Sequence, residues 1–232
     1  MEQAGRRSVA ARNRECCSTR WRRGRRPCNL SLDTAKPEVV ISCLRGDFAR
    51  QLQAHRFLAD YLRERPGTKL VYLSTANVFD ALNETPHIET DPPQAQSEYG
   101  CFKIACEQML TERLGEQLLI LRLPIVWGKN CPRLQILKGE ISRGEKVVLY
   151  RDISLNFTTD QQIGQWLRFL LEEKVSGIVH VGTKDVCSYA NFYRALIDWL
   201  GLEGRSSILG PSRSRSIWRY CRTAARSRSS CR

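Results

Sequence analysis

In the segment TKLVYLSTANVFD, residues 68–80, a continuous apolar run leads into two hydroxyl residues, Ser74 and Thr75, and this pattern is the strongest indication of the fold. A short apolar run without alternation is typical of a strand that is covered on both faces. In open parallel sheets, ligands bind beyond the carboxyl ends of the strands. We therefore expect Ser74 and Thr75 to lie at a strand end that faces a ligand.

Apolar runs alternate with amphipathic stretches on both sides of this segment. The predicted elements before Pro124 are strand 37–44, helix 47–67, strand 68–75, helix 97–115 and strand 116–123. Those after it are helix 131–144, strand 146–150, helix 158–173, strand 176–182 and helix 188–201. Strands separated by helices predict an α/β fold whose parallel sheet is covered on both faces. We expect residues from about 124 to 202 to form a smaller lobe appended to that sheet.

The formal net charge of +13 is distributed unevenly along the 232 residues. Residues 1–30 and 203–232 together hold 17 Arg and 3 acidic residues, which gives a charge of +14. Residues 31–202 hold 20 basic and 21 acidic residues, which gives −1. The two ends have no apolar periodicity, so we expect them to be disordered around a folded body at 31–202.

Four interpretations of the Arg-rich ends stay open. The one we favour is that they are not native to the domain, as after a misplaced reading frame or exon boundary. The repeats SRSRS and ARSRSS suggest a basic arm that binds RNA or DNA, which we do not favour. The front segment also has the composition of an organelle transit peptide. The last interpretation is a solvated tail without a role.

Residue usage also argues against several classes of function. No apolar run of about 18 residues occurs, so we expect no membrane span. There is no Cys-x-x-Cys pair, and His87 and His180 are isolated, so we expect no metal site. We expect the cysteines of the body to be small buried hydrophobes in a reducing compartment, which favours a cytoplasmic location. These are Cys43, Cys101, Cys106, Cys131 and Cys187.

The pair that could carry chemistry is Tyr99 and Lys103, in the segment YGCFK at the start of a predicted helix. A spacing of four places both side chains on one helix face. A neighbouring ammonium favours the phenolate and lowers the pKa of a tyrosine, which can then hand a proton to a carbonyl oxygen. A hydroxyl such as that of Thr75 can hold the same oxygen. The spacing alone is weak evidence, because an ordinary helix with a packed Tyr and a solvated Lys also shows it.

The wider pattern is more specific. LSTANVFD, then ETDPPQAQSEYGCFKIACE, then LLILRLPIVWG resembles extended short-chain dehydrogenases/reductases, most closely the dTDP-4-dehydrorhamnose reductase-like branch, over about residues 36–202. The matching positions are Ser74, Thr75, Phe79, Asp80, Glu89, Asp91, Pro92, Tyr99, Gly100, Lys103, Glu107, Leu121, Arg122, Trp127 and Gly128.

The resemblance implies a role for each site residue. Tyr99 would donate the proton, Lys103 would lower its pKa and bind the nicotinamide ribose, and Thr75 would orient the substrate carbonyl. Glu107 is expected to be a partner on the helix surface. The residues implied to contact NADP or NAD are Cys43, Leu44, Ser74, Tyr99, Lys103, Leu123 and Pro124. Those implied to face the substrate are Asn77, Val78 and Trp127, although core packing is an equal alternative for Trp127.

Two features depart from the family pattern. Ala76 and Asn77 stand where the rhamnose-reductase branch has Asp-Tyr, so the substrate is expected to differ from the namesake. The Gly-x-x-Gly-x-x-Gly turn that cradles the cofactor pyrophosphate is absent, since only Gly5 and Gly24 precede the first strand of the body. We therefore expect a partial Rossmann-type sheet that lacks its N-terminal strands. Its unpaired edge would reduce stability or promote association, for example as a homodimer.

These features predict an NAD(P)-dependent oxidoreductase, a reductase or epimerase, that acts on a nucleotide-linked keto-deoxy sugar. Because the pyrophosphate turn is absent, inactivity of this chain is an open alternative. So are a non-catalytic regulatory module on the same fold and nucleic-acid binding through the Arg/Ser ends.

Overall fold

A computed structural model describes residues 32–81, 86–150, 153–183, 186–202 and 207–210 of the chain. The expected disorder of 1–30 and of most of 203–232 lies outside these ranges. The chain divides into two compact units, residues 1–36 and 37–232. The described part of the first unit is a helical turn at 32–35. All other described elements belong to the second unit.

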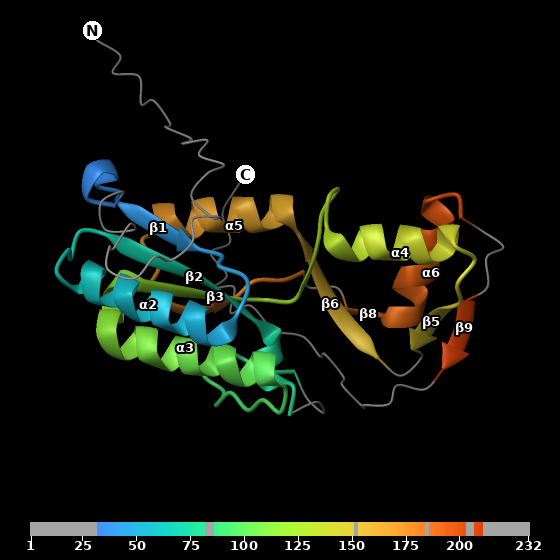
Figure 1. Cartoon of the computed structure of the whole chain (residues 1–232), viewed down its shortest axis with the longest axis horizontal. Helices are drawn as coiled ribbons and strands as arrows, with labels where there is room; N and C mark the ends of the chain where they lie inside the picture. Colours follow the sequence, from blue (N-terminus) through green and yellow to red (C-terminus); the bar gives the residue numbers. More distant parts are fainter. Residues whose placement is uncertain (1–31, 82–85, 151–152, 184–185, 203–206, 211–232) are drawn as a thin grey trace, which may run out of the picture. The chain divides into compact units, whose positions relative to one another are not determined.

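The second unit is organised around a four-stranded parallel sheet in the order β1-β2-β3-β7 (Figure 1). Its strands are β1 (Val39–Ser42), β2 (Lys69–Thr75), β3 (Leu118–Leu123) and β7 (Gly177–His180). All three pairings are parallel, as predicted for strands that are separated by helices. Within the described residues, β1 pairs only with β2 and forms one edge of the sheet.

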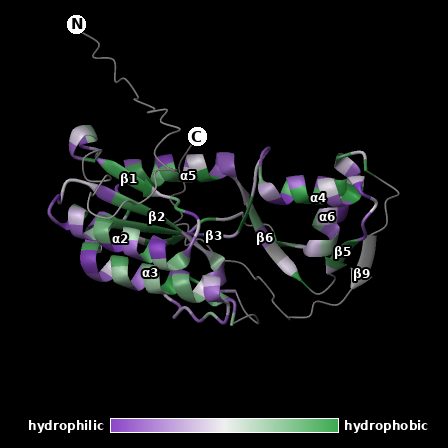
Figure 2. Cartoon of the chain, viewed as in Figure 1, coloured by the Kyte–Doolittle hydropathy of each residue, from purple (hydrophilic) through white to green (hydrophobic). Residues whose placement is uncertain are grey.

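Helices cover both faces of this sheet, as predicted. Helices α2 (Phe48–Arg63) and α3 (Glu98–Leu114) lie on one face, and α5 (Asp160–Glu172) lies on the other (Figure 1). Figure 2 shows hydrophobic colour along β1 and β2, whereas the helices carry both colours, as expected for elements with one buried side. Two short 3₁₀ helices complete this part: η1 (Ala76–Phe79) follows β2, and η2 (Gly115–Gln117) follows α3.

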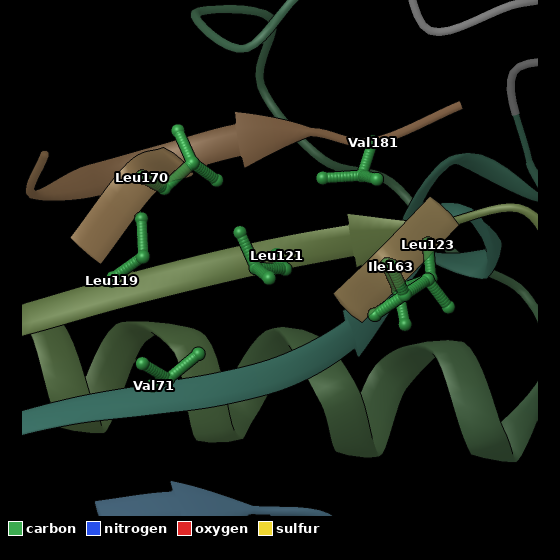
Figure 3. Packing of buried hydrophobic residues seen from close by; sticks show 7 residues of the cluster. All are labelled: Val71, Leu119, Leu121, Leu123, Ile163, Leu170 and Val181. Carbon is green, nitrogen blue, oxygen red and sulfur yellow. The ribbon is translucent and has the colours of Figure 1, made fainter. Parts of the chain in front are cut away.

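The core between the sheet and α5 is built from aliphatic side chains (Figure 3). Helix α5 contributes Ile163 and Leu170, which pack on residues of β2, β3 and the end of β7. The other members of this cluster are Val71, Leu119, Leu121 and Leu123 of the strands, and Val181, which directly follows β7. Because side chains alternate across a strand, Val71 faces α5 while Tyr72 and Ser74 face α3. The α3 side of β2 is the side that carries polar groups.

The remaining elements form the smaller lobe. Its helices are α4 (Pro132–Ser142) and α6 (Tyr189–Trp199). Its strands are β4 (Ile125–Trp127), β5 (Val147–Tyr150), β6 (Ser154–Thr159), β8 (Val186–Ser188) and β9 (Ser207–Gly210). They make one sheet in the order β4-β6-β8 and a β5-β9 pair. Leu137, Ile141, Val147, Leu149, Tyr193 and Ile197 are among the residues of its core.

The structure differs from the sequence-based assignment of the segment 158–182. We expected it in the lobe, but β7 pairs with β3 and α5 packs on the main sheet. The prediction that the body cysteines are buried is also only partly correct: Cys106 is fully buried, whereas Cys43 and Cys101 are exposed. Among the described residues, no helix is long and apolar enough to cross a membrane.

Candidate active site

Thr75 ends the central strand β2 and begins the turn that follows. It is the N-cap of η1, where its Oγ1 accepts a hydrogen bond from the Asn77 backbone N–H at 3.2 Å. The same hydroxyl donates to Asn77 Oδ1 at 2.9 Å. A hydroxyl offers one donor and two acceptor positions. Thr75 therefore keeps one acceptor position beyond its contacts with Asn77.

The start of α3 is tied to this strand end by Asp80, the residue after η1. One carboxylate oxygen of Asp80 accepts from the backbone N–H groups of Gln96 and Ser97, at 2.6 and 3.3 Å, and the other accepts from the Ser97 hydroxyl. Ser97 is the N-cap of α3 and accepts from the Gly100 N–H at 3.0 Å. Asp80 thus fixes the first turn of α3, including Tyr99, relative to the end of β2.

Gly100 allows the close approach between α3 and η1. A Cβ at this position would lie 2.5 Å from the Asn77 backbone oxygen and 2.6 Å from the Ala95 Cβ. Real Cβ atoms essentially never come so close to other heavy atoms. The glycine after Tyr99 is therefore required by packing at the site.

Tyr99 and Lys103 project from one face of α3, as their spacing predicts. Lys103 is only 7% exposed, and its Nζ donates to the Leu73 carbonyl of β2 at 2.8 Å. Tyr99 is 39% exposed. The Lys103 Nζ lies 5.8 Å from the centre of the Tyr99 ring. The arrangement places a fixed ammonium behind a phenol that solutes can reach.

The predicted lowering of the Tyr99 pKa is wrong. Burial raises the pKa of this phenol, and it outweighs a hydrogen bond with Thr75 and the charge of Arg45, which both lower the pKa. The Lys103 ammonium, whose Nζ donates to the Leu73 carbonyl, does not lower the pKa of this phenol as expected. Burial also lowers the pKa of Lys103 itself. Tyr99 is accordingly a protonated phenol at neutral pH, which suits a proton donor.

Sequence reasoning missed Arg45 and Phe48. Arg45 lies in the loop after β1, and its positive charge acts on the Tyr99 phenol. The Phe48 ring stacks on Phe102 at 4.6 Å and lies 6.0 Å from the Tyr99 ring. Nothing in the sequence around them marks either residue, because their proximity to Tyr99 arises from the packing of α2 against α3.

The prediction for Glu107 is also wrong. Glu107 is 4% exposed and forms an ion pair with Arg122 of β3, with its Oε2 2.7 Å from Arg122 Nη2. The Ser74 hydroxyl donates to Glu107 Oε1 at 2.5 Å. Ser74 and Arg122 are partners in the register of β2 and β3, so both reach the same carboxylate. Glu107 is therefore not a surface residue, and the Ser74 hydroxyl is bonded to it inside the fold, while the contact of Ser74 with a cofactor stays a prediction.

The predicted substrate residues occupy different environments. Asn77 stays beside Thr75, but Val78 is fully buried and cannot face a substrate, because it turns inward within η1. Trp127 lies in the core of the lobe, where its ring is 5.1 Å from Phe192 and 5.8 Å from Tyr193. Core packing is thus the better description of Trp127.

The remaining predicted cofactor residues lie at strand ends. Leu123 ends β3 but packs within the aliphatic core, and Pro124 follows it. Cys43 and Leu44 follow β1 and are exposed. Their contacts with a cofactor stay predictions. In the described part of the chain, no group of three His, Cys, Asp or Glu residues could hold a metal ion.

The hydrogen-bonding capacity of Lys103 is suited to a contact with the ribose of a nicotinamide cofactor. An ammonium has three N–H donors, and the Leu73 carbonyl accepts one of them. The other two remain for hydroxyl oxygens, and the lowered pKa of Lys103 shows that burial already disfavours its charge. Hydrogen bonds that Lys103 donates to ribose hydroxyl oxygens at this point would compensate that loss of solvation.

Comparison with known proteins identifies a family and a shared fold for this chain. The family of the RmlD substrate binding domain matches residues 46–231. A curated relative from Haloferax volcanii, "Probable low-salt glycan biosynthesis reductase Agl14", is 25% identical over 167 residues, covering 69% of this chain and 54% of the relative. The chain therefore spans about half the length of that relative.

Solved structures share the fold at lower identity. A dTDP-4-dehydrorhamnose reductase from Clostridium acetobutylicum superimposes with a TM-score of 0.70 at 21% identity, covering 82% of this chain and 75% of the other. A dTDP-4-dehydrorhamnose reductase from Bacillus anthracis in complex with NADP gives 0.67 at 20% identity, covering 82% and 73%.

Proposed function

The chain belongs to the RmlD-like family of short-chain dehydrogenases/reductases, and from this premise we propose that it is an NAD(P)-dependent oxidoreductase acting on a nucleotide-linked keto-deoxy sugar. The observation that carries the proposal is the meeting of Thr75, Tyr99 and Lys103 at the end of β2. The relatives named above include reductases of this kind, one of them in complex with NADP.

The proposed chemistry is proton transfer to a carbonyl oxygen. Tyr99 acts as the general acid, because its phenol is protonated at neutral pH and 39% exposed at the end of β2. Thr75 turns its hydroxyl from Asn77 Oδ1 toward the substrate oxygen and so orients the carbonyl beside Tyr99. Arg45 stabilises the phenolate that remains after transfer, because its positive charge lowers the pKa of this phenol. Reversal of these steps removes a proton from an alcohol.

Lys103 would hold the nicotinamide ribose with the two N–H groups that the Leu73 carbonyl leaves available. A nicotinamide bound there supplies or accepts the hydride. We propose NADP or NAD without a choice between them, because no described residue near Tyr99 distinguishes a 2′-phosphate. Cys43, Leu44 and Pro124 are proposed to line the same cofactor site.

The substrate is proposed to differ from dTDP-4-dehydrorhamnose itself. Ala76 and Asn77 follow Thr75 where the rhamnose-reductase branch has an acid and a tyrosine. Asn77 offers an amide that already hydrogen-bonds Thr75, so a sugar hydroxyl that meets Asn77 also affects how Thr75 is placed. A nucleotide-linked 4-keto-6-deoxy sugar is the proposed class.

The test is nicotinamide oxidation by Tyr99→Phe. The protein is mixed with NADPH or NADH and a nucleotide-linked 4-keto-6-deoxy sugar, and the loss of absorbance of the reduced nicotinamide is followed. Removal of a general acid lowers turnover by about 10²–10⁴-fold. Tyr61→Phe is the matched control, because Tyr61 is a buried tyrosine of α2 whose ring contacts Arg65 away from the site.

The outcomes separate the alternatives. Loss of turnover in Tyr99→Phe, with activity kept in Tyr61→Phe, supports the proposal. Equal turnover in Tyr99→Phe and the unaltered protein overturns the role of Tyr99. If the unaltered protein neither oxidises nor binds a reduced nicotinamide, the oxidoreductase proposal falls and a non-catalytic module on the same fold is the better account.

A further inference from the structure

We propose that Tyr72 is a positioning residue that holds the Lys103 ammonium at the end of β2 through the face of its aromatic ring. The proposal rests on the role of Lys103 in the proposed function and adds a residue that the resemblance does not assign. The Lys103 Nζ lies 4.6 Å from the centre of the Tyr72 ring. A cation within about 6 Å of an aromatic face is attracted by the ring quadrupole.

The surroundings make this contact the main one between Lys103 and an aromatic ring. The Tyr99 and Phe102 rings both lie 5.8 Å from Nζ, farther than Tyr72. The only hydrogen bond from Nζ that the described residues provide goes to the Leu73 carbonyl, next to Tyr72 in β2. The ring and the carbonyl therefore fix the ammonium from neighbouring points of one strand.

The Tyr72 ring is itself held rigidly. Tyr72 is 1% exposed and lies in the central strand β2, paired with Ser42 of β1 on one side and Ile120 of β3 on the other. The His55 ring packs edge-on against it at 5.0 Å. His55 in turn hydrogen-bonds through Nε2 to Ser42 Oγ at 2.8 Å.

A ring contact suits a functional lysine better than an ion pair does. A carboxylate in the place of Tyr72 would bind the ammonium strongly and compete with ribose hydroxyls. An aromatic face attracts the cation but accepts no conventional hydrogen bond, so the N–H donors stay free for a ligand. Glu107, one helical turn farther along α3, forms its ion pair with Arg122, and its charge raises the pKa of Lys103 by less than burial lowers it.

The test separates the electrostatic role of the ring from simple packing. Position 72 is changed to Phe, then to 4-fluorophenylalanine and 3,4,5-trifluorophenylalanine, which keep the ring while weakening its attraction for a cation. Labelling of Lys103 by acetic anhydride is measured across pH by mass spectrometry, in the full chain without substrate or nicotinamide. The same series at Tyr61, which lies under Arg65, is the matched control.

We expect Lys103 to be labelled faster with each added fluorine at fixed pH. Loss of a cation–π contact is worth about twofold to thirtyfold in the free-amine fraction. The pH midpoint should move downward in the same order. The Tyr61 series should leave both quantities unchanged. Tyr72→Phe should behave as the unaltered protein, because it keeps the ring face.

The proposal would be overturned if the rate of Lys103 labelling did not change across the fluorinated variants at position 72 while the circular dichroism spectrum showed an intact fold. An equal response in the Tyr61 series would also overturn it. The assay needs no turnover, so it is independent of the oxidation test with Tyr99→Phe. A graded series in a protein that does not oxidise nicotinamide would support the contact and overturn the proposed function; a flat series overturns the contact whatever the turnover.

Discussion

Two buried cations, Arg122 and Lys103, lie on the α3 side of the sheet, and they differ in the groups that contact them. Arg122 is 1% exposed and is paired with the Glu107 carboxylate, which also accepts from Ser74. Lys103 is 7% exposed and is held by the Leu73 carbonyl and the Tyr72 ring. Each cation also acts on a buried histidine: burial is the main cause of the lowered pKa of His180 and of His55, and the charges of Arg122 and Lys103 respectively lower these pKa values further.

The difference distinguishes a structural site from the proposed ligand site along one helix: the ion pair of Glu107 with Arg122 stabilises the fold, whereas Lys103 is proposed to bind a ligand. A buried cation that is paired with a carboxylate has its charge neutralised and its N–H donors occupied, so few donors remain for a ligand. A buried cation without its own carboxylate is unfavourable in the folded protein but ready to bind hydroxyl groups. Lys103 and Glu107 stand one turn apart on α3 and face Tyr72 and Ser74 of β2. The helix period and the strand period thus place both pairs in register.

The largest expected effect is on the ion pair. Glu107→Gln leaves the Arg122 charge buried without a counter-ion and should lower the free energy of unfolding by about 3–5 kcal/mol. Urea denaturation measures this change. Glu112→Gln on the exposed side of the same helix is the control and should stay within about 0.5 kcal/mol. Equal losses in the two variants would contradict a stabilising ion pair.

The next effect concerns the approach of α3 to the end of β2. Gly100→Ala forces a Cβ against the Asn77 backbone oxygen, and we expect a loss of about 3 kcal/mol in unfolding free energy, at the upper end for overpacking. Gly164→Ala in α5, where a Cβ would meet nothing within 4 Å, should instead gain about 0.5–1 kcal/mol. A neutral Gly100→Ala would show that α3 does not approach η1 as described.

The pH dependence tests the histidine beside Lys103. Burial, followed by the charge of Lys103, lowers the pKa of His55 to about 4, and a backbone hydrogen bond only partly offsets this. Because the unfolded chain takes up this proton at higher pH, stability is full above about pH 6.5 and falls as the pH decreases toward 4. His55 should account for about 2 kcal/mol of the loss between pH 7 and pH 5.

His55→Gln removes this group and should flatten the dependence, as urea unfolding at several pH values would show. His180, whose pKa burial and Arg122 lower to about 3, should keep its own share of the acid sensitivity in that variant. A His55→Gln protein that loses stability with acid as steeply as the unaltered one would contradict a neutral, buried His55.

The smallest expected effect is on Lys103 itself. Lys103→Met removes a charge whose burial is unfavourable and replaces it with an apolar chain of similar length, so the free energy of unfolding should change by less than about 1 kcal/mol. Thermal and urea unfolding are the measurements. Arg122→Met should be far more damaging, because it leaves Glu107 unpaired. A loss in Lys103→Met as large as that in Arg122→Met would remove the contrast between the two cations.

Local sequence patterns predicted the main sheet well because its apolar runs and helix periods are long. Strands β1, β2 and β3, the helices between them and the shared face of Tyr99 and Lys103 were all predictable. The three-residue strands β4 and β8 were not, since segments this short carry no periodicity.

The errors at the site have a common cause. The places of Glu107 and Val78 depend on which side of a strand or turn meets which helix, and spacing along the chain does not contain that information. The prediction of a lowered Tyr99 pKa failed for a similar reason, because burial of the phenol raises its pKa and the motif does not reveal that burial. The placement of β7 beside β3 likewise depended on long-range pairing.

The proposed function depends on Lys103 being available to a nicotinamide ribose. The most direct measurement is calorimetric titration of the protein and of Lys103→Met with NADPH and, in parallel, with reduced nicotinamide mononucleotide, which needs no pyrophosphate contact. The account predicts saturable binding to the unaltered protein and at least about tenfold weaker binding to Lys103→Met with its fold intact. Equal affinities of the two proteins, or no binding of either nucleotide to the unaltered one, would contradict it.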